Sequence, residues 1–231
     1  MKADLHIHTK YSYDSMTPPK DAVESAIEKG IGCICVTDHG KIQGAIEAMK
    51  FGFDKNILVI PGIEILSASG DILGINVKKI IPDGLSAEET IKEIRKQGGI
   101  AVIPHPFGRL FSGFWGGEEK IKKANSDAIE IFNASIHFNS SNLKALDFSQ
   151  KNNFSFTAGS DAHRKEFIGR GYIEFSGRIL SERDIIDAIA NKKGIVGGRS
   201  LTFFELLKNS LNADVRAMIK YCLLRKKSNK K

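Results

Sequence analysis

Short apolar segments rich in β-branched residues alternate along the chain with segments of helical periodicity. The apolar runs predict eight strands, over residues 3–7, 33–37, 57–65, 71–77, 100–103, 128–132, 154–157 and 172–175. Between them the pattern predicts six helices, over residues 19–29, 41–51, 86–97, 117–124, 140–151 and 181–191. Strands that alternate with helices at this spacing indicate an α/β fold with a parallel sheet, which can be open and doubly wound or closed into a barrel. The pattern leaves both architectures open.

The alternation extends over residues 1–200, and a chain of 231 residues is long enough for one large α/β domain. Residues 201–224 are predicted to form a helix packed on the outside of this domain. The last residues, 225–231, read RKKSNKK and are predicted to be a disordered basic tail. One segment, HPFGRLFSGFWGGEE, interrupts the pattern with glycine and aromatic residues. It is predicted to be a long loop, and such loops commonly bind ligands.

The composition is that of a soluble globular protein, with 42% hydrophobic and 26% charged residues. No apolar run approaches the roughly 20 residues of a spanning helix, and the first residues lack the features of a secretory signal. We therefore expect a cytoplasmic protein without a membrane partner. An odd count of three cysteines fits a reducing compartment. Cys33 and Cys35 share one face of a predicted strand, where we expect them to pack in the interior.

The formal net charge of +7 at first favours a nucleic-acid partner. Five of the basic groups lie in the tail 225–231, however, and removing them leaves a net charge of +2 for the rest of the chain. A terminal run of like charges is most often solvated. Nucleic acid is therefore the less favoured partner.

The six histidines lie at or after the ends of predicted strands. His6 and His8 end the first strand, and the other four follow later strands: His39, His105, His137 and His163. The carboxyl ends of parallel strands meet at one edge of the sheet, and catalytic groups gather there in α/β folds. We therefore expect these imidazoles to lie close together.

Carboxylates occupy the same strand ends, namely Asp14, Asp38, Glu64, Glu130 and Asp161. A divalent metal explains such a mixture, because its charge offsets the repulsion and desolvation of buried acids. Alternate residues of a strand share a face, so His6 and His8 can face one ion. An isolated histidine is most often a structural, hydrogen-bonded residue, but five coincidences at one edge favour a metal site.

The motifs DLHIHTKYSYD, VTDHG, PGIEI, PHP and GSDAH, followed by IGRGYIEF, resemble the motif series of the PHP family, named for polymerase and histidinol phosphatase. The series runs in order from Asp4 to His163. The resemblance implies a distorted, TIM-like (β/α)7 barrel with a trinuclear metal centre at the carboxyl ends of its strands. It also implies a free-standing metal-dependent phosphoesterase, and it would make the sheet closed.

The resemblance assigns the ligands to three ions: His6, His8 and Asp161 to the first, Glu64 as a bridge and His105 to the second, and Asp14, His39 and His163 to the third. Many members have histidine at the position of Asp14. His137 lies close to the position of one further ligand of the second metal. Glu130 is expected to orient a ligand, and Asp38 to hold the ring of His39. Zinc, manganese and iron all suit this ligand set.

The charges of this ligand set also favour phosphate chemistry. Three divalent ions outweigh the charges of Asp14, Glu64 and Asp161, so the centre would attract a phosphate ester. Clustered metals lower the pKa of a bridging water and supply hydroxide as the nucleophile. We expect this hydroxide to act with Asp161, His163 and Arg170. Arg170 and Arg109 are predicted to contact the phosphate of a small metabolite or nucleotide.

Two other functions remain open. A non-catalytic RNA-binding barrel, similar to a ribonuclease P protein subunit, would suit the basic tail, but so many buried ionisable groups without an ion would be costly. A metal-dependent amidohydrolase would also carry His-x-His on its first strand. The missing position for a carbamylated lysine and the intact SDAH weigh against it. The oligomeric state, the metal and the choice between monoester and diester are not predicted.

Overall fold

The computed structural model describes residues 1–108, 114–136 and 139–210. Nine strands lie in these ranges: β1 (Lys2–Ile7), β2 (Cys33–Val36), β3 (Leu58–Ser67), β4 (Gly70–Ile75), β5 (Ile100–Ile103), β6 (Ala128–Asn133), β7 (Ser155–Gly159), β8 (Gly171–Glu174) and β9 (Ile195–Gly198). The α-helices described are α1 (Pro19–Glu28), α2 (Gln43–Gly52), α3 (Ala87–Lys96), α4 (Gly117–Ala124), α5 (Asn139–Asn152), α6 (Glu182–Ala190) and α7 (Phe203–Ser210). A short 3-10 helix, η1, covers Lys165–Phe167.

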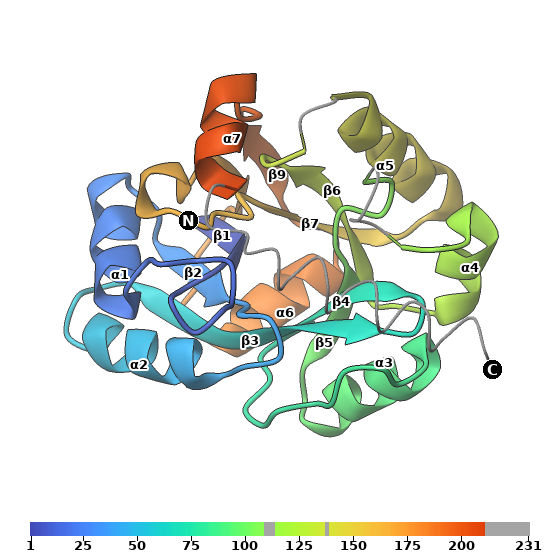
Figure 1. Cartoon of the computed structure of the whole chain (residues 1–231), viewed down its shortest axis with the longest axis horizontal. Coiled ribbons are helices and arrows are strands. Elements are labelled where there is room, and N and C mark those ends of the chain that lie inside the picture. Colours follow the sequence, from blue (N-terminus) through green and yellow to red (C-terminus); the bar gives the residue numbers. More distant parts are fainter. Residues whose placement is uncertain (109–113, 137–138, 211–231) are drawn as a thin grey trace.

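The strands form one sheet in the order β7-β6-β5-β4-β3-β2-β1-β8-β9. Strands β1 to β3 are parallel, as are β5 to β7, whereas β4 is antiparallel to both of its neighbours. Strands β1 and β7 also meet at their carboxyl ends, because Ile7 of β1 and Ala162, which follows β7, form a parallel bridge. There the His8 amide donates to the Ala162 carbonyl over 3.0 Å. The sheet from β1 to β7 is therefore a nearly closed barrel surrounded by helices (Figure 1), and the predicted closed architecture is confirmed.

Three apolar clusters hold the barrel together. Helices α1 and α2 pack on the outside of β1 to β3, and α3, α4 and α5 pack over the following strands. A third cluster fills the barrel interior and includes Cys33 and Cys35, both fully buried as expected. Helix α6 joins this interior cluster through Ile185 and Ile189, next to Ala3 at the beginning of β1. The amino-terminal end of the barrel is thus filled with apolar side chains, and the opposite end is left for polar ones.

A bulge in β1 orients the first two histidines. Asp4 pairs with Ile34 but Ile7 pairs with Val36, so β1 has one extra residue at this point. Ile7 packs outward with Ile34 in the cluster under α1 and α2. The residues on either side of Ile7, His6 and His8, therefore face the other way, toward the centre of the barrel.

The predicted strands and helices all occur within the described residues, with small differences at their ends. Strand β9 was not predicted, because Ile195–Gly198 is short and half of it is glycine. The prediction of a parallel sheet is wrong for β4, which is antiparallel to β3 and β5, and for β8, which is antiparallel to β1 and β9. Helix α7 lies in the region where a helix was predicted over 201–224, and residues 211–231, with the predicted tail, lie outside the described residues.

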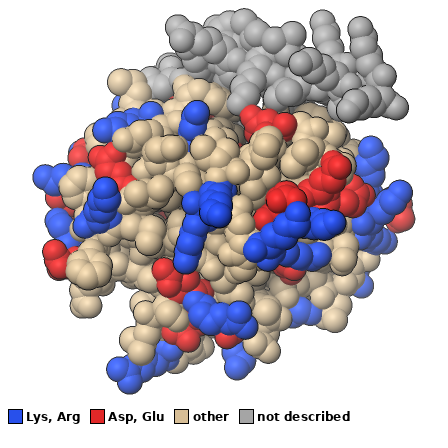
Figure 2. Space-filling view, turned by 90° about the horizontal axis from the view of Figure 1, so that it is seen from below, with Lys and Arg blue, Asp and Glu red and all other residues tan. Residues whose placement is uncertain are grey.

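Basic and acidic side chains are interspersed on the face seen in Figure 2. Ion pairs such as Lys55 with Glu24 and Lys96 with Glu93 bring opposite charges together on the surface. This fits the small net charge expected for the chain without its last residues. Among the helices described, none combines the length and the apolar composition needed to cross a membrane.

Candidate metal centre

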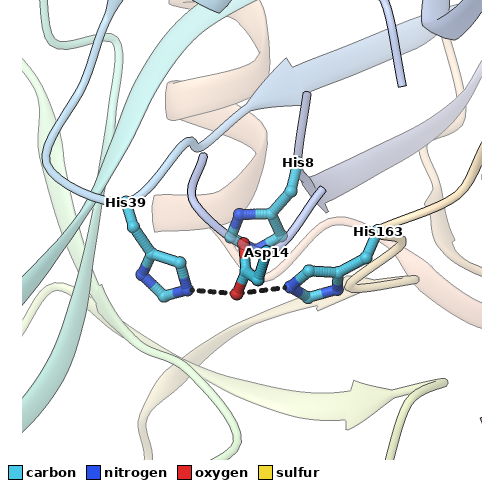
Figure 3. A group of neighbouring side chains, drawn as sticks. All are labelled: His8, Asp14, His39 and His163. Atoms are coloured by element: carbon cyan, nitrogen blue, oxygen red, sulfur yellow. Dashed lines mark hydrogen bonds and ion pairs between the residues drawn. The ribbon is translucent and has the colours of Figure 1, made fainter. Parts of the chain in front are cut away.

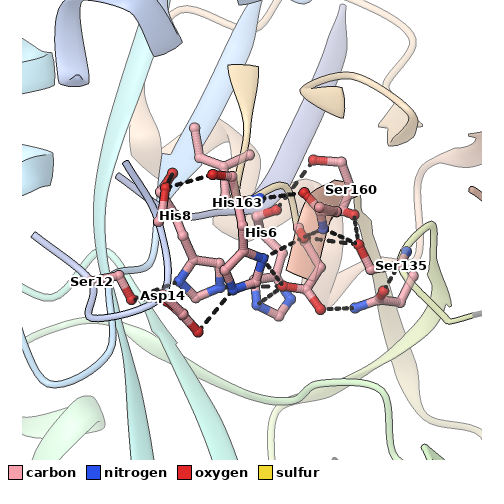
Figure 4. A network of polar contacts seen from close by, with 12 residues as sticks. His6, His8, Ser12, Asp14, Ser135, Ser160 and His163 are labelled. Carbon is pink, nitrogen blue, oxygen red and sulfur yellow. Dashed lines mark hydrogen bonds and ion pairs between the residues drawn. The ribbon is translucent and has the colours of Figure 1, made fainter. Parts of the chain in front are cut away.

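The strand ends bring most of the predicted site residues to one end of the barrel (Figure 4). They come from β1 (His6), the segment after β1 (His8, Asp14), the segment after β2 (His39), β3 (Glu64), the segment after β5 (His105) and the segment after β7 (Asp161, His163). Two predicted residues, Arg109 and His137, lie outside the described residues.

Asp14 lies between two imidazoles at the outer side of this cluster (Figure 3). Its Oδ2 is 3.2 Å from Nε2 of His39 and 3.0 Å from Nε2 of His163. The ring of His8 stacks on those of His39 and His163, with centroids 4.8 and 4.3 Å away. One ligand atom of each of these four residues lies within 4.8 Å of the others, close enough to bind one ion.

Glu64 of β3 and Asp161, which follows β7, both face His6 and His8. Oε2 of Glu64 is 3.3 Å from Nε2 of both His6 and His8. Oδ1 of Asp161 is 3.5 Å from Nε2 of His6 and 3.3 Å from Nε2 of His8. The pair of histidines from the opening motif therefore meets two carboxylates.

A third group of ligand atoms contains Asp71, which sequence analysis did not select. Glu64, His105 and Asp71 offer atoms within 4.8 Å of one another, and His105 Nε2 is 3.5 Å from Glu64 Oε1. Asp71 lies near the beginning of β4, and the sequence argument applies only to the carboxyl ends of parallel strands. Because β4 runs antiparallel, its beginning lies at the same end of the barrel as the carboxyl ends of the parallel strands. Burial and the charge of Glu64 raise the pKa of Asp71 to about 7.

The donor atoms fit a bound cation. Nε2 of His8 is buried and makes no hydrogen bond within the described chain, although carboxylate oxygens of Glu64 and Asp161 lie 3.3 Å away. A buried polar atom without a partner costs free energy. Imidazole nitrogen and carboxylate oxygen are ordinary ligands of zinc, manganese and iron. A cation among these atoms would satisfy the imidazole and both acids together.

The imidazoles and carboxylates alter one another's proton affinity. Burial opposes the charge on Glu64, but His39 and His6 outweigh it and hold the pKa of Glu64 well below its usual range. The pKa of Asp14 is likewise held low against burial by His163 and His39. Burial disfavours the charged form of His39, yet Glu64 and Asp14 raise its pKa to about 9, and the pKa of His163 is also about 9. His39 and His163 thus each lie beside a carboxylate that favours the protonated ring.

Comparison with known proteins agrees with this geometry. Residues 139–193 match the family model described as PHP-associated. An uncharacterised protein of Methanocaldococcus jannaschii is 39% identical over 144 residues, which make up 58% of this chain and 82% of that protein. A two-domain protein of Bacteroides vulgatus, described as containing a predicted PHP-like metal-dependent phosphoesterase, superposes with a TM-score of 0.73 and 20% identity. The match covers 91% of this chain and 69% of that one.

The chain belongs to the PHP family. A further relative, from Caldicellulosiruptor saccharolyticus, bears the name probable phosphatase. It is 27% identical over 199 residues, which cover 74% of this chain and 83% of that protein. The fold is thus similar to that of a PHP-like protein of known structure, and the strand ends of this chain carry groups of candidate metal ligands.

In this PHP chain the orienting contact expected of Glu130 is present. Oε1 of Glu130 lies 3.1 Å from Nδ1 of His6, so Nε2 of that ring is left to face Glu64. Oε2 accepts hydrogen bonds from the backbone N–H of His105 and from the side chain of Asn133, both over 2.9 Å. One buried carboxylate therefore orients the ring of His6, the usual support for a metal-binding imidazole, and also holds the backbone of His105.

Asp38 does not hold the ring of His39, and this expectation is corrected. Its carboxylate accepts hydrogen bonds from the backbone N–H of Thr9 over 2.6 Å and from the Thr9 hydroxyl over 2.7 Å. Gly44 permits this arrangement, because a Cβ atom there would lie 1.9 Å from Asp38 Oδ2. Asp38 therefore joins the end of β2 to the residue that follows His8, rather than to its own neighbour in sequence.

Arg170, predicted to contact phosphate, forms an ion pair with Glu205 of α7. Glu205 also pairs with Arg199 over 3.2 Å. Nη1 of Arg170 is buried and has no hydrogen-bond partner among the described residues. Contact with phosphate stays a prediction for Arg170. A phosphate group would have to compete with Glu205 for the guanidinium.

Two predicted ligands have a left-handed backbone. The φ angle is 31° at His105 and 52° at Asp161, a conformation that residues other than glycine rarely adopt. Such strain persists only where surrounding contacts hold it, and it is common at functional sites. Gly159, two residues before Asp161, lies so close to β1 that a Cβ atom would be 2.4 Å from that of His6. The segment after β7 is therefore pressed tightly against the first strand.

Proposed function

We propose that this PHP chain hydrolyses the phosphate ester of a small phosphorylated molecule, a metabolite or a nucleotide, at a centre of three divalent metal ions. The position of Glu64 carries this proposal. Its Oε2 lies 3.3 Å from the Nε2 atoms of His6 and His8 and 3.5 Å from Nδ1 of His39, and its Oε1 lies 3.5 Å from Nε2 of His105. One buried carboxylate is thus within reach of imidazoles from three different strand ends, as a bridge between ions must be.

The candidate ligand atoms form four overlapping groups, and we divide them among three ions as the resemblance to the PHP family implies, with Asp71 added. His6, His8 and Asp161 would hold the first ion, His105 with Asp71 the second, and Asp14, His39 and His163 the third, with Glu64 shared by the first two. His137, outside the described residues, is the remaining proposed ligand of the second ion. Asp71 adds a fourth carboxylate to the three proposed from the sequence. It lowers the net charge of the centre without removing its positive excess.

Bound divalent ions would activate water near neutral pH and offset the charge of the phosphoryl oxygens. A bound ion would displace the proton of each imidazole that holds it, since a protonated imidazole cannot bind metal. Glu130 fixes the ring of His6, and the carbonyl of Asp161 lies 3.0 Å from Nδ1 of His163, so each ring turns Nε2 toward the centre. Asp161, His163 and Arg170 are the proposed catalytic side chains, with Arg109 as a further phosphate contact.

Exposure indicates the side from which a substrate approaches. His39, Asp161 and His163 are 15 to 17% exposed, whereas the side chains of His6 and His8 are fully buried. The ring of Tyr13 stacks on that of His39, with centroids 4.7 Å apart, and is itself 41% exposed. We infer that the substrate reaches the centre over the third ion, beside Tyr13.

The decisive experiment combines metal analysis with a substrate panel. Metal-free protein is loaded with zinc, manganese or iron and assayed on phosphomonoesters, cyclic and linear phosphodiesters, short oligonucleotides and amides. We expect bound metal by elemental analysis and metal-dependent release of phosphate or of an alcohol. His6→Ala and Asp161→Asn should lose metal and turnover, whereas Lys151→Ala, an exposed residue of α5, should match the parent chain.

Three outcomes would contradict the proposal. Protein that binds no metal and is inert toward every ester with each metal is not a phosphoesterase. RNA binding that weakens steeply with salt would then favour the non-catalytic barrel. Hydrolysis of amides alone would favour an amidohydrolase.

A further inference from the structure

Helix α7 contacts the metal-ligand segment through one buried side chain. Asn209 lies in the last turn of α7 and is 2% exposed, although its neighbours Lys208 and Ser210 are exposed. Polar side chains are rarely buried so completely without a specific partner. The partners of Asn209 lie 46 to 74 residues earlier in the chain.

Both ends of the Asn209 amide bond to the segment that follows β7. Its Oδ1 accepts a hydrogen bond from the backbone N–H of His163 over 2.9 Å. Its Nδ2 donates to the carbonyl of Asp161 over 3.1 Å and to the hydroxyl of Ser135 over 3.0 Å. The same amide therefore holds the backbone of two residues whose side chains face the candidate metal centre.

The segment needs such support because its backbone is strained. Asp161 has a φ of 52°, which costs free energy unless surrounding contacts hold it. The Ser135 hydroxyl, near Ser160 in Figure 4, donates to the carbonyls of Ser160 and Asp161. The Ser15 hydroxyl donates to the carbonyl of His163. Within the described chain, Asn209 is the member of this network that comes from the C-terminal helix, and it contacts both ligand residues.

We propose that Asn209 is a positioning residue for the metal centre and that α7 is thereby part of the active site. The amide fixes the peptides of Asp161 and His163, which sets the direction of their side chains toward the ions. This inference rests on the proposed metal centre, but the hydrogen bonds themselves do not. Residues that orient ligands from outside typically change metal affinity by about 10- to 100-fold when removed.

Asn209→Leu keeps the approximate volume of the side chain and removes all three hydrogen bonds, and Asn209→Ala also removes the volume. Lys208→Ala is the matched control, since Lys208 is the preceding residue of α7 and its side chain pairs with Glu166 at the surface. Amide hydrogen exchange by NMR is measured first, on metal-free protein. We expect exchange at the His163 amide to accelerate at least tenfold in both Asn209 variants and to be unchanged in Lys208→Ala.

Cobalt titration is measured next, followed by its visible absorption spectrum. We expect about 10- to 100-fold weaker binding and an altered spectrum in the Asn209 variants, with native values in Lys208→Ala. A variant with parental exchange at the His163 amide, or with parental cobalt affinity and spectrum, would overturn the inference. If both variants fail to fold, amide exchange in the parent chain is the test. Rapid exchange at the His163 amide there would show that it does not donate to Asn209, which would overturn the inference.

These measurements separate the two proposals. A parent chain that binds no cobalt refutes the metal centre, while the exchange result still tells whether Asn209 holds the segment. A parent chain that binds cobalt as tightly as both folded variants keeps the metal centre and refutes the role of Asn209.

Discussion

Oδ2 of Asp14 lies 3.0 Å from Nε2 of His163, although 149 positions separate the two residues in the chain. The same oxygen is 3.2 Å from Nε2 of His39. Ser12 donates its hydroxyl hydrogen to the other carboxylate oxygen over 2.7 Å, which fixes the orientation of Asp14. A carboxylate thus lies between the two imidazoles that are proposed to hold the third ion with it.

Replacement of Asp14 tests whether this position binds metal. Asp14→Ala leaves His39 and His163 without the carboxylate between them and should lose the third ion and most turnover. Asp14→His restores a ligand without the negative charge, so activity should recover in part, with a different order of preference among zinc, manganese and iron. Metal content and rates with each metal check both variants. Equal loss in the two variants would contradict a ligand role.

Glu64→Gln should be the most damaging conservative change in the centre. The amide cannot bridge two cations, and residues that merely orient ligands are already worth about 10- to 100-fold. We expect turnover to fall more than about 100-fold, with loss of two of the three ions by elemental analysis. Retention of all bound metal in Glu64→Gln would refute the bridge.

Asp71→Asn tests the ligand that the sequence did not reveal. The change removes one carboxylate near His105 and should weaken one ion while the other two stay bound. Because the pKa of Asp71 is about 7, binding of that ion in the parent chain must displace a proton from Asp71 near neutrality. Affinity should therefore rise more steeply between about pH 6 and 8 in the parent chain than in Asp71→Asn, measured by calorimetry.

The stability of metal-free protein should fall as the pH rises above neutrality. The pKa of His39 and of His163 is raised from 6.5 to about 9 in the folded chain. A raised pKa adds stability that is fully present below 6.5 and is lost as the pH rises through 9, on the order of 3 kcal/mol for each group. The low pKa of Asp14 has the opposite sign, and its contribution is lost in acid.

Thermal unfolding followed by circular dichroism checks this dependence. Metal-free protein should have its highest melting temperature below about pH 7 and lose stability toward pH 9. Metal-loaded protein should show the reverse trend, because metal binding requires neutral imidazoles and strengthens as protons leave. A rise in the melting temperature of metal-free protein from pH 7 to 9 would contradict the assigned charges.

The sequence allowed prediction of those ligands that lie at the carboxyl ends of parallel strands, because the direction of the strands places them together. Asp71 escaped this reasoning because β4 is reversed, and strand direction does not appear in a hydrophobic pattern. Asp38 was misassigned because adjacency to His39 suggested a contact, whereas its carboxylate faces Thr9. Asn209 could not be found either, since its role depends on where α7 packs. Local pattern therefore predicts the elements, and tertiary packing decides which polar side chains meet.

The pairing of Arg170 with Glu205 provides a last test, of the phosphate contact. Arg170→Ala removes the guanidinium, whereas Glu205→Gln frees it from its carboxylate partner. If Arg170 contacts phosphate, kcat/KM should fall about tenfold or more in Arg170→Ala, in line with a charge-assisted hydrogen bond worth about 1.5 to 3 kcal/mol. Glu205→Gln should keep or raise kcat/KM, and metal content should be unchanged in both.

A structural ion pair predicts a different result for the same two variants. Arg170→Ala and Glu205→Gln would then lose thermal stability together and have similar kinetics, since each breaks the same contact. The kinetic difference between the variants, across several phosphate esters, is therefore the informative quantity. Equal kcat/KM in Arg170→Ala and the parent chain on every ester would show that Arg170 serves to attach α7 to the barrel rather than to bind substrate.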